Sequence, residues 1–94
     1  MNLDEVRVKI NDINDQMLAL FKERMELSKD VAAAKKEMNK ATYDAKRERD
    51  ILDKVTRDAG PDLDLYARRF FEALFSLSRI YQSEQLFQDN EFTL

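Results

Sequence analysis

The feature that most constrains this chain is a long run of apolar residues at helical spacing between Leu3 and Met38. This stretch contains no Gly or Pro, and its apolar residues recur at steps of three and four: Leu3, Val6, Ile10, Ile13, Met17, Leu20, Leu27, Val31, Ala34 and Met38. Such steps place the side chains along one face of an α-helix for about five heptads. The spacing therefore predicts a single helix over residues 3–38.

This predicted helix is too long for the chain that contains it. At about 1.5 Å per residue it would span roughly 54 Å. A compact monomer of 94 residues has a radius of gyration near 12 Å and a diameter of roughly 32 Å. About half of the helix would therefore project with its apolar face exposed, and the simplest cover is a second copy related by a two-fold axis. We expect a homodimer.

Composition narrows the fold class and the kind of chemistry. Gly and Pro occur once each, so turn-forming residues are scarce and a single all-α domain is expected. The chain has neither Cys nor His, which removes disulfides, thiolate metal sites and the commonest general base. A net charge of −3 argues against a nucleic-acid partner. With no signal peptide and no apolar run of membrane length, we expect a cytoplasmic protein that binds no metal and no membrane.

Two further helices are predicted after the long one. They cover residues 45–58 and 65–86, and a frayed tail follows over residues 88–94. Asp44 can cap the first of these two, and the Ala59-Gly60-Pro61 segment ends it. Asp62 or Asp64 can cap the second. The expected architecture is one very long, one short and one medium helix in an intertwined dimeric bundle.

Several polar residues fall where apolar ones are expected. Arg24 lies on the apolar face of the long helix, and Lys35 follows eleven residues later on the same face. In the third helix Ser78 and Gln82, four residues apart, enter an apolar stripe. A cation on such a face is either paired or holds an anion, whereas an Arg or Lys on a helix is ordinarily solvated. Residue spacing alone supports a helical dimer, leaves both readings of these cations open, and goes no further.

At these residues the sequence resembles the all-helical chorismate mutases, the intertwined dimers of the shikimate pathway. The resemblance rests on the joint spacing of segments along nearly the whole chain: Val6-Arg7-Val8-Lys9-Ile10, Glu23-Arg24-Met25-Glu26-Leu27, Lys35, Asp44-Ala45-Lys46-Arg47-Glu48-Arg49, Ser78 and Gln82. No single motif among them is specific. Two departures, Asn14 for a usual Asp and Ala32 for a common Gly, concern dimer packing rather than chemistry.

The resemblance assigns the positive charges of the site to substrate binding. Arg24 matches the arginine that pairs with a substrate carboxylate, and Ser78 matches a hydroxyl near a carboxylate. Arg47 matches a further cation of the site. Arg7 matches the arginine that enters the active site of the other subunit, which agrees with the dimer expected from helix length.

The remaining residues are assigned to the breaking bond and the ring hydroxyl. Lys35 and Gln82 match the two hydrogen-bond donors to the ether oxygen of chorismate. Glu48 matches the carboxylate that accepts from the ring hydroxyl, with Asp44 beside it. The implied catalytic residues are therefore Lys35, Gln82, Arg24 and Glu48.

The implied activity is an intramolecular Claisen-type rearrangement of the dianion chorismate to prephenate, in phenylalanine and tyrosine biosynthesis. The reaction needs no nucleophile, metal or cofactor, so a site without His or Cys suffices. One alternative is an isochorismate-pyruvate lyase of the same fold, although those lyases lack an Asp-x-x-Arg-Glu arrangement like that of Asp44 to Glu48. The other is a non-catalytic helical dimerisation or regulatory module, which need not keep the full set of site residues.

Overall fold

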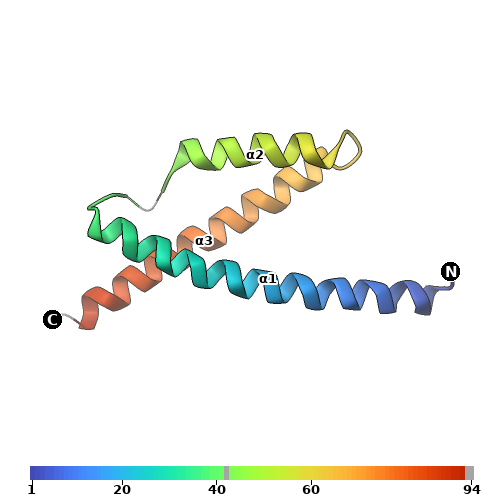
Figure 1. Ribbon diagram of the computed structural model, residues 1–94, viewed down its shortest axis with the longest axis horizontal. Helices are drawn as coiled ribbons and strands as arrows, with labels where there is room; N and C mark the ends of the chain where they lie inside the picture. The colour runs from blue at the N-terminus through green and yellow to red at the C-terminus, as the bar shows by residue number, and fades with distance from the viewer. Residues whose placement is uncertain (42, 93–94) are drawn as a thin grey trace.

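The chain folds into three helices (Figure 1). The computed structural model describes residues 1–41 and 43–92, with side-chain surroundings as far as Leu86. Its helices are α1 (Leu3–Glu37), α2 (Ala45–Ala59) and α3 (Asp64–Phe92), and the described residues form no strand. Helices α2 and α3 diverge from the turn that joins them, and α3 crosses the C-terminal half of α1 (Figure 1). The predicted all-α class is confirmed.

Local sequence explains both ends of α1. The side chain of Asn2 accepts a hydrogen bond from the Glu5 amide at 2.9 Å, which caps the first turn. At the other end Asn39 adopts a positive φ of 55°, a conformation that Asn tolerates better than most residues. The Lys40 amide then donates to the Lys35 carbonyl at 2.8 Å, which closes the helix in a Schellman motif. The helix ends within one residue of the predicted boundary.

The N-terminal half of α1 projects away from the other two helices (Figure 1). The molecule measures 58 × 27 × 14 Å, and its radius of gyration is 17.0 Å, against roughly 12 Å for a compact chain of this length. Ile10, Ile13 and Leu20 on the predicted apolar face are 49%, 54% and 64% exposed. This chain alone therefore leaves much of that face uncovered.

The second helix begins and ends at the predicted signals. The Asp44 side chain accepts from the Arg47 amide at 3.0 Å and caps α2. Gly60, with φ of 82°, follows the last residue of the helix and precedes Pro61. Leu52 is buried, and the neighbouring Ile51 is half-buried.

The third helix runs further than predicted. It begins at Asp64, whose carboxylate accepts from the Leu65 amide at 2.6 Å, and continues to Phe92. The predicted end at Leu86 is wrong because residues 87–92 contain no Gly or Pro to stop the helix. The frayed tail predicted for residues 88–94 is thus helical as far as Phe92, and residues 93–94 lie outside the described part.

The packing of α3 against both other helices creates the interior. Among the described residues α1 and α2 each contact α3 but not each other. The buried side chains are half apolar and half polar: Ala32, Leu52 and Phe75, with Ser28, Ser78 and Gln82. No described helix is long and apolar enough to cross a membrane. Such a high polar share in so small an interior marks this region as the candidate site.

Candidate active site between the three helices

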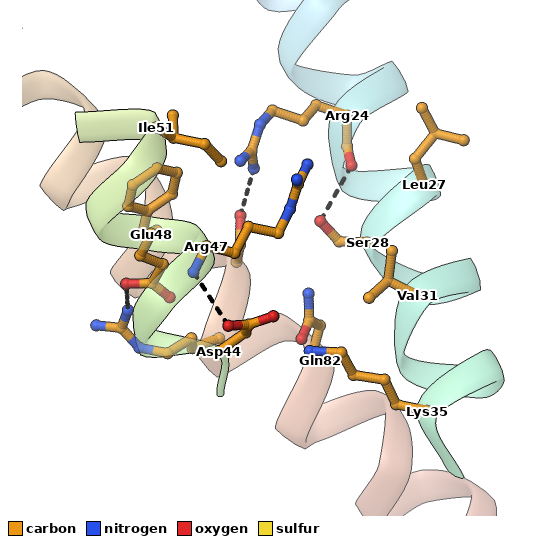
Figure 2. Close-up of a pocket in the computed structure, with 13 residues that line it drawn as sticks. Arg24, Leu27, Ser28, Val31, Lys35, Asp44, Arg47, Glu48, Ile51 and Gln82 are labelled. Carbon is orange, nitrogen blue, oxygen red and sulfur yellow. Dashed lines mark hydrogen bonds and ion pairs between the residues drawn. The ribbon is translucent and has the colours of Figure 1, made fainter. Parts of the chain in front are cut away.

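A cavity of about 240 Å³ lies between α1 and α2, with α3 completing its lining (Figure 2). It brings together seven of the eight residues predicted from the sequence: Arg24, Lys35, Asp44, Arg47, Glu48, Ser78 and Gln82. Six further residues complete the lining: Leu27, Ser28, Val31, Ile51, Phe75 and Arg79. Residues distant in sequence thus meet in one cavity.

Arg24 joins α1 to α3 without a carboxylate partner in the described part of the chain. Its Nη1 donates to Ser78 Oγ at 2.6 Å, and its guanidinium carbon lies 5.8 Å from the centre of the Phe75 ring. Burial, and then the positive charge of Arg47, lower the pKa of the Arg24 guanidinium. Two cations that disfavour each other in one cavity favour the binding of an anion between them.

The buried hydroxyl of Ser28 holds the backbone beneath Arg24. Ser28 Oγ donates to the Arg24 carbonyl at 3.1 Å, one helical turn away. The sequence interpretation missed Ser28, although its spacing of four from Arg24 on the inward face was a usable signal.

The first turns of α2 supply one cation and two carboxylates. The Asp44 carboxylate caps the helix, and the Arg47 side chain extends into the cavity toward Arg24 (Figure 2). Glu48 is half-buried and forms an ion pair with Arg79 of α3. The positive end of the α2 dipole adds to the field of the cations.

Lys35 and Gln82 lie together at the end of the cavity away from Arg24 (Figure 2). Gln82 is only 8% exposed, and its Oε1 has no hydrogen-bond partner among the residues that the structure describes. The unpaired atom is a hydrogen-bond acceptor, so it can accept from a donor on a ligand.

The charges of the lining favour a doubly negative ligand. Four cationic and two anionic side chains face the cavity, an excess of two positive charges: Arg24, Lys35, Arg47 and Arg79 against Asp44 and Glu48. The described residues contain no cluster of three or more carboxylate, imidazole or thiol groups that could hold a metal ion. The site can therefore bind and orient a dianion and donate hydrogen bonds to it.

Two arginines, Arg7 and Arg79, remain to be placed. Arg7 is exposed near the start of α1 and does not line the cavity of its own chain. Arg79 lines the cavity but was not predicted, because an Arg beside a polar pair on a helix carries no signal of its own.

A second hollow, apolar and larger, runs along the projecting part of α1. Its volume is about 510 Å³. Apart from Arg24 its lining is apolar: Met17, Leu18, Leu20, Phe21, Phe70, Phe71 and Leu74. Arg24 therefore stands between the polar cavity and this apolar groove.

Comparison with known proteins points to one family. The family model described as chorismate mutase type II matches residues 6–83. A protein named chorismate mutase from Methanocaldococcus jannaschii is 38% identical over 55 residues, which cover 58% of this chain. The matched segment spans 56% of the length of that relative.

Proposed function

The chain belongs to the chorismate mutase type II family, and on this premise we propose that it converts chorismate to prephenate by an intramolecular Claisen-type rearrangement. The observation that carries the proposal is the cavity whose lining has two excess positive charges. Chorismate is a dianion, and it needs restraint in its reactive conformer rather than a nucleophile or a metal. A cytoplasmic role in phenylalanine and tyrosine biosynthesis is part of the same proposal.

In this proposal the two ends of the cavity have different tasks. Arg24, with the Ser78 hydroxyl at 2.6 Å, binds one substrate carboxylate, and Arg47 adds positive charge beside it. Glu48 accepts a hydrogen bond from the ring hydroxyl. These contacts select the conformer in which the ends of the new carbon–carbon bond approach each other.

Lys35 and Gln82 act on the bond that breaks. The carbon–oxygen bond breaks ahead of carbon–carbon bond formation, so negative charge grows on the ether oxygen in the transition state. The Lys35 ammonium and the Gln82 amide donate hydrogen bonds to this oxygen. Because both are already in place, they stabilise the transition state more than the ground state.

The proposal is tested by offering the purified protein chorismate and isochorismate separately. We expect chorismate to disappear with formation of prephenate, and isochorismate to release little pyruvate. Rapid pyruvate release from isochorismate would favour the lyase, and no reaction with either compound by the folded protein would favour a non-catalytic module.

We also propose that two chains form the active unit and share each site. The exposed apolar face of α1 and the apolar groove beside Arg24 support a second copy as their cover. The distance of Arg7 from the cavity of its own chain supports a role in the partner's cavity. Each of the two sites would then contain Arg7 of the partner subunit.

Mixing two damaged proteins tests this sharing. Arg7→Ala and Arg24→Ala proteins should each be impaired, because each lacks a cation in both sites of its dimer. Refolded together, they should regain about a quarter of native activity, since half of the dimers are mixed and carry one intact site. Sedimentation should confirm that the mixed sample is dimeric. Well-formed mixed dimers without recovered activity would contradict a role for Arg7 across the interface.

A further inference from the structure

Arg79 of α3 lines the cavity and binds α2, the helix that makes no backbone contact with α1 among the described residues. It follows Ser78 directly on α3, and these two neighbours bind opposite helices. Ser78 accepts from Arg24 of α1, whereas Arg79 forms its ion pair with Glu48 of α2, Nη1 donating to Oε1. Side-chain exposure is 35% for Arg79 and 21% for Glu48, so the pair is partly shielded from water.

Two further contacts fix the guanidinium of Arg79. Its Nη2 donates to Ser76 Oγ at 3.2 Å, three residues earlier on α3. Its central carbon lies 5.0 Å from the centre of the Tyr43 ring, in the connection just before the Asp44 cap. A guanidinium held by a hydroxyl, a ring and a carboxylate presents its donors in a defined direction.

The consequence falls on Glu48, the neighbour of Arg47. Without this ion pair the Glu48 carboxylate would have no fixed direction. The ion pair holds it in one place, apart from the guanidinium groups of Arg24 and Arg47 (Figure 2). Only Oε1 is engaged, and the hydrogen bonds formed among the described residues leave Oε2 to accept from a ligand.

We propose that Arg79 is a positioning residue that orients the Glu48 carboxylate toward the ring hydroxyl of the substrate. This inference rests on the proposed function. Arg79 itself touches neither the breaking nor the forming bond. Its loss therefore acts through Glu48 and only on substrates that carry the hydroxyl.

The test measures kcat and KM for chorismate and for an analogue that lacks the ring hydroxyl. Arg79→Met should lower kcat/KM for chorismate by about 10- to 100-fold, the scale of a misplaced binding group. It should change kcat/KM for the analogue by less than about threefold. Arg79→Lys should recover part of the kcat/KM for chorismate, because a lysine cation restores some of the pairing with Glu48. Arg68→Met is the matched control, because Arg68 pairs with Glu72 on the same helix at 3.2 Å and lies outside the cavity.

A double-mutant cycle separates positioning from general stability. After Glu48→Gln, the further change Arg79→Met should cost little additional activity, because its route of action is gone. Three results would each overturn the inference: additive losses in the double variant, equal losses on both substrates, or native kinetics of Arg79→Met. In each case turnover of chorismate by the native protein would still support the proposed function. A native protein that fails to rearrange chorismate would overturn both. Thermal unfolding confirms that each variant is folded, and Arg79→Lys carries the test if Arg79→Met does not fold.

Discussion

Replacing Arg24 with Met is expected to lower kcat/KM for chorismate by about 10²- to 10³-fold, the result of removing one member of a desolvated charge pair. The variant keeps much of the side-chain length while losing the charge that would meet a substrate carboxylate. Thermal stability should hold or rise, since Arg24 is half-buried and has no carboxylate partner in the described part of the protein. Steady-state kinetics and a thermal melt measure both effects.

The matched control for Arg24 is Arg49→Met. Arg49 is exposed on α2 and lies outside the cavity, so its loss should leave kcat/KM near the native value. A large fall in the melting temperature of Arg24→Met would instead identify Arg24 as a structural residue. Its hydrogen bond to Ser78 would then serve to join α1 to α3.

The second large effect is expected at Gln82, as a change in pH dependence. An amide donates a hydrogen bond at any ordinary pH because it does not titrate. In Gln82→Glu the carboxyl can donate only when protonated, and a glutamate has an unperturbed pKa of about 4.3. The nearby charge of Lys35 favours the ionised form and opposes the rise in pKa that burial alone would cause.

Gln82→Glu should therefore lose about 10²-fold in kcat at pH 7.5, the scale of one transition-state donor, and recover as the pH falls. Native protein should keep a nearly level profile over the same range, and Gln82→Ala should be poor throughout. The measurement is kcat against pH for the three proteins, with circular dichroism at each pH as the control for folding. If Gln82→Glu has a level profile, or equals the native protein at pH 7.5, Gln82 does not donate to the ether oxygen.

The helices could be predicted from the sequence where their spacing or their end residues carry strong signals. Apolar spacing determined α1, the Asp44 cap began α2, and Gly60 ended it with its positive φ. The end of α3 could not be predicted in this way, since polar residues after Leu86 look like a tail but contain nothing that breaks a helix. Periodicity reports burial, and helix termination depends on backbone signals instead.

The site was predictable to the extent that its residues interrupt an apolar pattern. Arg24, Ser78 and Gln82 stand on inward faces, and the structure places them around one cavity. Arg79 interrupts no pattern, because its role arises only when α2 and α3 bring it to Glu48. An ion pair between residues of two different helices leaves no pattern in the local sequence, so only the tertiary structure revealed it.

The most direct test of the central claim, that this cavity stabilises the rearrangement, is a calorimetric titration with a bicyclic dicarboxylate that imitates the transition state. An active site binds such a mimic at least about 10²-fold more tightly than its substrate. We expect one mimic bound per chain with that advantage over chorismate, and a loss of most of the affinity in Arg24→Met but not in Arg49→Met. Binding no tighter than that of chorismate, or equal binding by the native and Arg24→Met proteins, would contradict the assignment of the reaction to this cavity.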